Sequence, residues 1–214
     1  MKEKNGSVWD KFASVYNAFV TGTPGNKKAY EAICKRIRGV VKDKEVLEIA
    51  TGPGVIAKQV ATEAKSMIAT DFSEKMLAVA HRGVVPSNLR FEQADACRLP
   101  YEDNSFDAVI IANALHIIPE PERALAEIRR VLKKDGILIA PNFIHENKNK
   151  VSGAFSKALS AAGVRFEAKW DADGFIAFLE RNGFEELNSK QLNSTIPMVY
   201  VEAAGKSADK DGKG

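Results

Sequence analysis

The chain has 214 residues, of which 45% are hydrophobic and 28% charged, and its formal net charge is +3. This balance excludes extended disorder as the main state and is typical of one globular domain. A chain of this length can bury roughly 70% of its unfolded surface, so its core needs neither disulfides nor a structural metal. Most of the net charge lies at the two ends, and we interpret the basic segment 27–44 as a solvated helix face.

Short apolar runs alternate with amphipathic stretches, which is the pattern of a parallel sheet covered by helices. Strands are expected at 45–49, 66–70, 89–92, 106–112 and 136–140. Helices are expected between them, at 55–64, 74–82 and 121–134. The Lys-Asp-Gly sequence at 134–136 predicts a turn between the last of these helices and the fifth strand.

The alternation changes after the fifth strand. Helical stretches at 149–162 and 171–182 precede two strand-like runs, 184–192 and 198–204, which are joined by a short link. Strands so closely connected are antiparallel, because parallel neighbours need a long crossover. We therefore predict an α/β fold with a seven-stranded, mostly parallel sheet, a reversed final strand and helices on both faces. One domain is expected over 1–204, followed by a disordered tail at 205–214.

The strongest local motif runs from Glu48 through a small-residue turn into the helix expected at 55–64. A carboxylate ends a strand, and Gly52 and Gly54 would let a ligand approach the backbone closely. The first amides of the following helix carry partial positive charge toward such a ligand. The same residues fit the Gly-x-Gly-x-x-Ala form of a dinucleotide site, so an NAD(P)-dependent oxidoreductase is an alternative, as is a turn that binds nothing.

Two acidic residues follow the next two strands. Asp71 stands where an acidic side chain accepts hydrogen bonds from ribose hydroxyls, which indicates a nucleoside in either class of enzyme. Asp95 follows the third strand, where it can receive an exocyclic amine, and Leu99 and Pro100 can flank a ring. Asp95 is therefore the residue that separates the two classes.

Together these residues resemble the class I S-adenosylmethionine-dependent methyltransferases, and more closely their ubiquinone/menaquinone branch. The resemblance covers residues 44–141, and it is carried by the segments 48–54, 69–71, 94–96, 106–107, 113–116 and 132–136. It implies a Rossmann-like fold that binds S-adenosylmethionine and releases S-adenosylhomocysteine.

The resemblance assigns nine residues to the cofactor: Glu48, Ala50, Gly52, Gly54, Asp71, Phe72, Asp95, Ala96 and Asn113. It implies that Glu48 lies near the methionine ammonium and that Asn113 lines the methionine end. The two glycines would form a backbone cradle, Asp71 would hold the ribose, and Asp95 with the amide after it would hold adenine. Ala50 stands where the family usually has its first glycine, and a negative φ would make the alanine tolerable.

The predicted methyl acceptor is a small, apolar or aromatic metabolite, methylated at O, S, N or C by in-line displacement. Its pocket is expected from a lid at 1–27 and a cap insertion at 143–171, with Tyr16 reaching the donor. His116 is the leading candidate for a general base, although packing within a turn is an equal interpretation, and His145 and Glu146 are weaker candidates. The segment 113–116 lacks the Pro-Pro-aromatic run of enzymes that methylate nucleobases, which disfavours such an acceptor.

The remaining features indicate no further cofactor. Cys34 and Cys97 follow no metal-ligand or redox spacing, so we interpret them as reduced thiols and expect no metal. The sequence shows no signal-peptide pattern or membrane-spanning stretch, and a cytoplasmic protein without a nucleic-acid partner is expected. An RNA-binding module using segment 27–44 is the least favoured alternative, and the sequence leaves the oligomeric state open.

Overall fold

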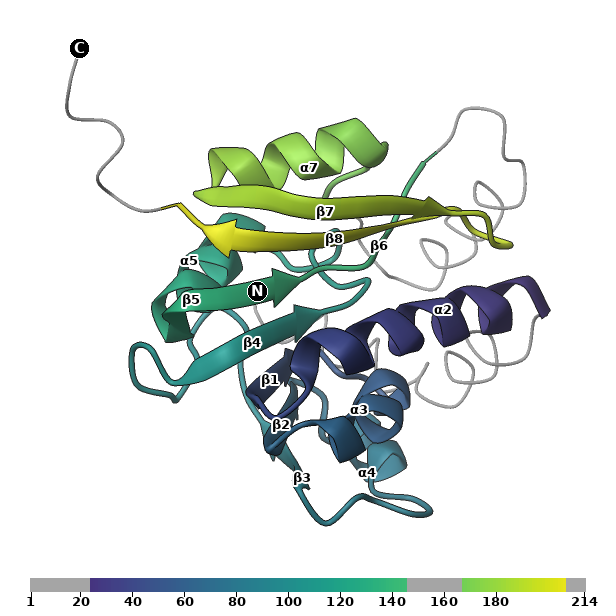
Figure 1. Ribbon diagram of the computed structural model, residues 1–214, viewed down its shortest axis with the longest axis vertical. Helices are drawn as coiled ribbons and strands as arrows, with labels where there is room; N and C mark the ends of the chain where they lie inside the picture. Colours follow the sequence, from purple (N-terminus) through teal and green to yellow (C-terminus); the bar gives the residue numbers. More distant parts are fainter. Residues whose placement is uncertain (1–23, 146–166, 207–214) are drawn as a thin grey trace.

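The computed structural model of the chain describes residues 24–145 and 167–206 (Figure 1). The first half of the chain forms α2 (Pro24–Val41), β1 (Glu45–Ile49), α3 (Val55–Val60), η1 (Ala61–Glu63), β2 (Ser66–Asp71), α4 (Glu74–Ala80), β3 (Leu89–Gln93) and β4 (Phe106–Ile111). The second half forms α5 (Pro121–Val131), β5 (Leu132–Ile139), β6 (Asn142–Phe143), α7 (Ala172–Arg181), β7 (Phe184–Leu192) and β8 (Met198–Gly205). Most of the predicted lid, the helix predicted at 149–162 and most of the tail lie outside the described residues.

Within the described residues eight strands form one sheet, in the order β3-β2-β1-β4-β5-β8-β6, with β7 paired to β8. The pairs among β1 to β5 are parallel, whereas β8 is antiparallel to β5, β6 and β7. The short link between β7 and β8 allows no crossover, and this forces the reversal. The predicted α/β fold with a mostly parallel sheet and a reversed final strand is confirmed.

Local chemistry sets the helix starts that the sequence predicted. The Ser73 hydroxyl accepts a hydrogen bond from the Met76 amide at 3.1 Å and caps α4. The Asp171 carboxylate caps α7 in the same way, through the Gly174 amide at 2.8 Å. Pro121 begins α5, where its missing N–H costs no hydrogen bond.

The region around β5 differs from the prediction. The strand begins at Leu132, inside the stretch expected to be helical, because the pairing of β4 with β5 shifts register between Phe106 and Ala108. The predicted turn at 134–136 lies in this irregular stretch of the strand. The short strand β6 was not predicted, and it pairs with Met198 and Val199 of β8, beyond the point where Pro141 ends β5. Long-range pairing therefore extended the sheet where local sequence indicated a turn.

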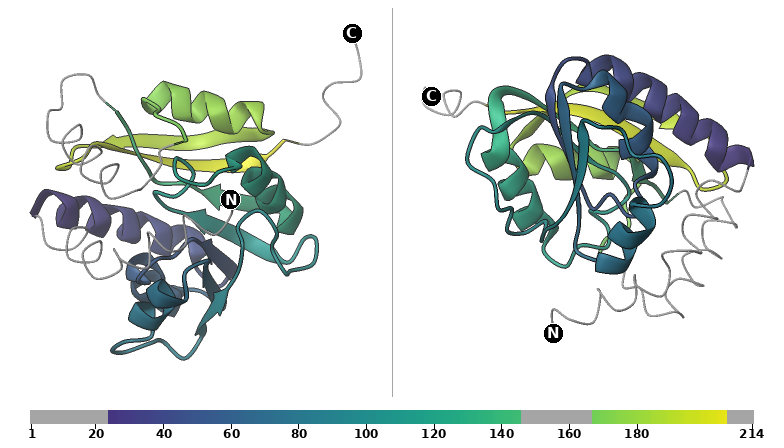
Figure 2. Two further views of the ribbon diagram at one scale, coloured as in Figure 1. Left: turned by 180° about the vertical axis from the view of Figure 1, so that it is seen from behind. Right: turned by 90° about the horizontal axis from the view of Figure 1, so that it is seen from below.

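Helices cover both faces of the sheet (Figure 2). On one face α2 and α3 pack over alternate strand residues such as Val46 and Ile110. On the other face α5 and α7 pack over the neighbouring residues Leu47 and Val109. Both faces of the central strands are thus buried, as is usual in parallel sheets, and polar side chains gather at the ends of the strands.

An ion pair joins the exposed Arg36 of α2 to the buried Glu202 of β8. Arg36 donates two hydrogen bonds to the Glu202 carboxylate, at 2.6 and 2.8 Å, and the Tyr200 hydroxyl donates a third at 2.7 Å. This network fixes α2 across the sheet, over the strand ends that carry the candidate site. None of the helices in 24–145 and 167–206 is long and apolar enough to cross a membrane.

Candidate functional site

A cavity of about 230 Å³ opens at the carboxyl ends of β1 to β4. One water molecule needs only ~10–15 Å³ of such space, so the cavity has room for a ligand of many atoms. The lining comes from the ends of four strands and the segments that follow them: Ala50 and Gly52 after β1; Asp71 at the end of β2, then Phe72, Ser73 and, in α4, Met76; Ala94, Asp95, Ala96 and Cys97 after β3; Ala112, Asn113, Ala114, Ile117, Ile118, Pro119 and Glu120 after β4. Ligands of open α/β sheets bind at this edge.

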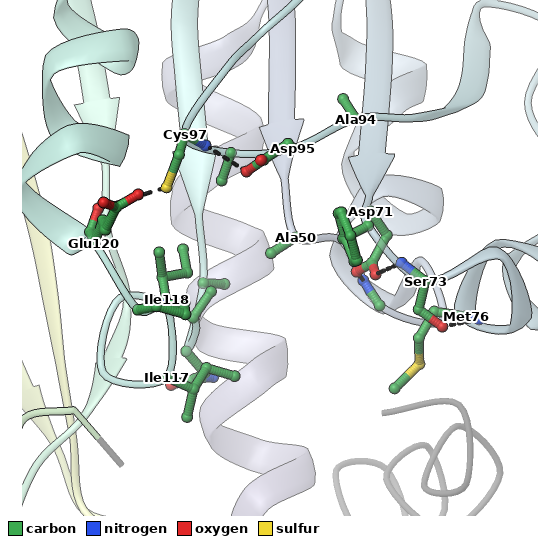
Figure 3. A pocket seen from close by; sticks show the side chains of 17 residues that line it. Ala50, Asp71, Ser73, Met76, Ala94, Asp95, Cys97, Ile117, Ile118 and Glu120 are labelled. Atoms are coloured by element: carbon green, nitrogen blue, oxygen red, sulfur yellow. Dashed lines mark hydrogen bonds between the residues drawn. The ribbon is translucent and has the colours of Figure 1, made fainter. Parts of the chain in front are cut away.

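The four segments face one another across the cavity (Figure 3). Asp71, Ser73 and Met76 lie on one side, opposite Ile117 and Ile118. The structure therefore brings together residues that are distant in sequence, and Ile117 and Ile118 give the cavity an apolar stretch of wall after β4.

Three residues of the turn after β1 have left-handed backbone conformations. The φ angles are 53° at Ala50, 56° at Gly52 and 75° at Gly54. Ala50 thus lacks the negative φ that would have made its methyl tolerable, because the chain must turn sharply from β1 into α3. The alanine methyl costs roughly 1 kcal/mol in this conformation.

The two glycines of this turn differ in their surroundings. A Cβ at Gly52 would meet no atom within 4 Å, and Gly52 lines the cavity. A Cβ at Gly54 would lie 2.9 Å from the Phe91 ring, and Gly54 is not among the lining residues. Gly52 thus has open space for a ligand, whereas Gly54 allows α3 to pack closely on β3.

The Asp71 carboxylate joins two of the turns. One oxygen accepts a hydrogen bond from the Gly52 amide at 2.8 Å, and the other accepts from the Ser73 amide at 2.9 Å. Each carboxylate oxygen has a second lone pair, so Asp71 can still accept hydrogen bonds from a ligand. The neighbouring Phe72 is 51% exposed and also lines the cavity.

Asp95 shapes the turn after β3. Its carboxylate accepts a hydrogen bond from the Cys97 amide at 2.9 Å, and its carbonyl accepts from the Arg98 amide at the same distance. The side chain still lines the cavity beside Ala96. Turn formation and ligand binding are therefore compatible at this residue.

A buried polar cluster lies beside the cavity, between α2 and the ends of β1 and β4. Glu48 is 2% exposed and Asn113 is 5% exposed, and Asn113 donates a hydrogen bond from Nδ2 to the Tyr30 hydroxyl at 2.8 Å. Among the described residues, Glu48 Oε2 and Asn113 Oδ1 have no hydrogen-bond partner. Buried acceptors of this kind are costly unless a ligand satisfies them.

Glu48 also has an unusual acidity. Burial raises the pKa of its carboxyl to about 8, and the charge of Asp71 contributes in the same direction. A cation placed beside Glu48 would favour the ionised form and lower this pKa again. The cluster is thus suited to a positively charged group.

His116 is held away from the cavity lining. Its Nδ1 lies 3.1 Å from Asn142 Oδ1, and its ring meets that of Phe143 edge to face. Asn142 Nδ2 donates to the Phe143 carbonyl at 2.8 Å, so its Oδ1 must accept and His116 carries its proton on Nδ1. Burial lowers the pKa of His116 to about 4, and nearby His145 contributes to this, which keeps the imidazole neutral at pH 7.

Seven of the nine predicted cofactor residues line the cavity; Glu48 lies in the buried cluster and Gly54 beneath the turn. Tyr16 falls outside the described residues. Sequence reasoning missed Tyr30, which looked like an ordinary core residue of an amphipathic helix, and it missed the apolar wall after β4. Ser73 could have been found, since a serine before a helix is a typical cap.

Comparisons with known proteins show the family to which this chain belongs. A family model described as "Methyltransferase domain" matches residues 47–140. The demethylmenaquinone methyltransferase of Clavibacter sepedonicus is 33% identical, over 97% of this chain and 95% of the relative. The ubiquinone/menaquinone biosynthesis C-methyltransferase of Rickettsia bellii is 28% identical, over 74% of this chain and 75% of the relative. Among solved structures, the DhpI–SAH complex matches with a TM-score of 0.72 at 20% identity, over 95% of this chain and 96% of that chain.

Fold and cavity together define a Rossmann-like methyltransferase. The chain belongs to the class I S-adenosylmethionine-dependent methyltransferases, in the ubiquinone/menaquinone branch, and S-adenosylmethionine is its methyl donor. The oxidoreductase alternative is not favoured, since it predicts an all-parallel sheet and β8 is reversed.

Proposed function

We propose that the cavity binds S-adenosylmethionine and that the methyl acceptor is a small aromatic molecule of the quinol type. The observation that carries the cofactor assignment is charge: Asp71, Asp95 and Glu120 line the cavity, and no lysine or arginine of the described residues does. S-adenosylmethionine has a sulfonium and an ammonium against one carboxylate, a net positive charge. A dinucleotide would instead bring an anionic pyrophosphate into an acidic cavity.

Polar groups are spaced so that each part of the cofactor finds a partner. Asp95 and the Ala96 amide are proposed to hold the adenine edge, with Phe72 and Ile118 against the ring. The Asp71 carboxylate, already fixed by two amides, is proposed to accept from the ribose hydroxyls. At the other end, Glu48 and Asn113 offer buried acceptors to the methionine ammonium.

When bound, S-adenosylmethionine supplies a methyl group on a sulfonium, and the carbon–sulfur electron pair remains on sulfur as the methyl passes to the acceptor. The protein then has to align the acceptor and exclude water. Good alignment of the reacting groups can lower the activation barrier by up to ~7–11 kcal/mol. Ile117, Ile118 and Pro119 form an apolar wall after β4 that supports this exclusion.

His116 and Tyr16 remain proposals as catalytic residues. The Nδ1–H form of His116 leaves Nε2 as the acceptor nitrogen, which suits a hydrogen bond from an acidic hydroxyl such as that of a quinol. With a pKa near 4 the imidazole is a weak base, so this role fits an acceptor whose proton is acidic.

The quinol class rests on the relatives, whose names include a demethylmenaquinone methyltransferase matched over nearly the whole chain. Cytoplasmic localisation and the absence of a nucleic-acid partner also remain proposals. On α2, Arg36 is paired with Glu202 and Arg38 Nε donates to the Gln59 carbonyl, so these two cations already have partners within the protein.

Calorimetric titration with S-adenosylhomocysteine tests the cofactor site. In the Asp95→Asn variant the amide oxygen can still accept from Cys97 N–H, while its NH₂ would oppose the adenine amine, so we expect affinity to fall on the order of tenfold. Asp103→Asn, at an exposed residue paired with Arg130, serves as the matched control and should bind as the wild type does. Wild-type protein that binds NAD but not S-adenosylhomocysteine, or full affinity in Asp95→Asn, would overturn the assignment.

A further inference from the structure

Tyr30 contributes to the site from a distant part of the chain. It lies on α2, and its hydroxyl accepts the hydrogen bond from Asn113 Nδ2 at 2.8 Å. Both side chains are buried, with exposed fractions of 6% and 5%. Asn113 also lines the cavity, so this contact joins the inner face of α2 to the wall of the site.

The contact determines which atom of Asn113 is left for a ligand. With Nδ2 engaged by Tyr30, Oδ1 is the acceptor that has no partner among the described residues. The backbone of Asn113 is fixed in a left-handed conformation, with a φ of 52°, and its amide donates to the Pro141 carbonyl at 2.8 Å. The side-chain amide is therefore presented in one orientation, as an acceptor.

A second buried acceptor lies in the same cluster. Glu48 Oε2 also has no partner among the described residues. Cys34, one turn after Tyr30 on α2, is close enough to Glu48 for that carboxylate to raise the pKa of its thiol, after burial as the main cause. The inner face of α2 thus covers Glu48 as well as Asn113, and two acceptors without donors suit an ammonium group, which carries three donors.

We infer that Tyr30 is a positioning residue for the methyl donor: it holds the Asn113 amide so that Oδ1, together with Glu48, accepts from the amino group of the donor's methionine moiety. This inference rests on the proposed assignment of the cavity to S-adenosylmethionine. Tyr30 touches no reacting atom and acts through Asn113. Without the Tyr30 hydroxyl, Asn113 Nδ2 would lose its partner. The side-chain amide could then flip by 180° and direct Nδ2, a donor, at the ammonium group.

Two ligands separate this role from a general structural one. S-adenosylhomocysteine has the amino acid moiety, whereas 5′-methylthioadenosine has the same nucleoside without it. In Tyr30→Phe we expect the affinity for S-adenosylhomocysteine to fall on the order of tenfold and the affinity for 5′-methylthioadenosine to stay unchanged. Tyr200→Phe is the matched control, since it also removes a buried hydroxyl hydrogen bond under α2, to Glu202, and it should change neither affinity.

The double variant Tyr30→Phe/Asn113→Ala tests whether Tyr30 acts through Asn113. If it does, Tyr30→Phe should have no further effect on S-adenosylhomocysteine binding once Asn113 is alanine. The inference is overturned if Tyr30→Phe weakens both ligands equally, if it weakens neither, or if its effect persists in the double variant. Wild-type protein that binds neither ligand would instead reject the cofactor assignment itself, so the two failures can be told apart.

Discussion

At the scale of single residues, the described backbone is most strained at Ala50. Four non-glycine residues have positive φ, namely Asp43, Ala50, Asn104 and Asn113. Aspartate and asparagine tolerate this conformation because their short polar side chains can bond locally, whereas alanine has only the steric cost of its methyl. The turn after β1 therefore stores strain at the wall of the cofactor cavity.

Replacement of Ala50 by glycine should relieve this strain. For Ala50→Gly we expect the free energy of unfolding to rise by about 0.5–1 kcal/mol, because the gain at positive φ exceeds the extra entropy of an unfolded glycine. Urea denaturation measures the change. Ala32→Gly, at an exposed position within α2, should shift stability by a similar amount in the opposite direction, and loss of stability in Ala50→Gly would contradict the explanation.

Glu48 makes stability depend on pH. Its folded-state pKa of about 8 lies above the ordinary value of 4.5, so between these values the folded chain binds more protons than the unfolded chain. The resulting stabilisation of the protonated form is complete below pH 4.5 and is lost as pH rises through 8.

Substitution Glu48→Gln removes this titration while keeping the shape of the side chain. We expect the variant to gain stability relative to the wild type as pH rises from 5 to 8, by up to ~1.4 kcal/mol for each pH unit. His116 titrates in the opposite direction at lower pH, but it is present in both proteins and cancels in the comparison. Unfolding curves whose difference is the same at pH 5 and pH 8 would show that Glu48 is not the group responsible.

At the scale of elements, the two glycines of the β1–α3 turn have different roles, one at the cavity and one in helix packing. Gly52 faces the open cavity, and Gly54 lets α3 and α4 approach β3, since a Cβ there would lie 2.9 Å from Phe91 and 3.2 Å from Ala80. Because both glycines have positive φ, alanine at either position is strained. The two substitutions nevertheless differ in what the added methyl meets.

We expect Gly54→Ala to lose more stability than Gly52→Ala, by roughly 1 kcal/mol or more, because only the former also overpacks the core. Gly52→Ala should show the larger loss of S-adenosylhomocysteine affinity, since its methyl enters the space proposed for the ligand. Thermal unfolding and calorimetry on the same pair of variants provide the two measurements. If Gly52→Ala lost more stability and Gly54→Ala lost more affinity, the roles assigned to the two glycines would be wrong.

At the scale of the whole molecule, the net charge of the chain and the charge of the cavity lining have opposite sign. The chain is basic overall, with a net charge of +3, while the charged residues lining the cavity are acidic. This arrangement fits a cationic ligand in the cavity and gives the basic side chains of α2 no part in binding it. Arg36 and Arg38 on this helix are engaged with Glu202 and with the Gln59 carbonyl.

The exposed cations of α2 should therefore give no specific RNA binding. Fluorescence anisotropy with a labelled RNA should show only weak binding that falls steeply as the salt concentration rises. At an ionic strength of ~0.15 M no saturable binding should remain. Saturable binding that disappears when Lys35, Arg38 and Lys42 are all changed to glutamate would instead identify α2 as a phosphate-binding face.

Much of the fold follows from local sequence. The bounds of β1 and β7 agree with the prediction, and the reversal of β8 follows from a link too short for a crossover. Asp71 and Asp95 could be placed in the site because each stands at or just beyond the carboxyl end of a strand whose partners are parallel. Periodicity and connection length are short-range properties, so the sequence by itself determined the class of fold and the edge of the sheet at which the ligand binds.

Tertiary structure alone decided the features that depend on distant contacts. The register shift between β4 and β5, the added pairing of β6 and the positive φ of Ala50 all arise where one segment must fit another. The bond from Asn113 to Tyr30 joins residues 83 positions apart, and no local pattern indicates it. A side chain's partner depends on which surfaces the whole chain brings together, and this is why the orientation of the site's acceptors appears only in the folded molecule.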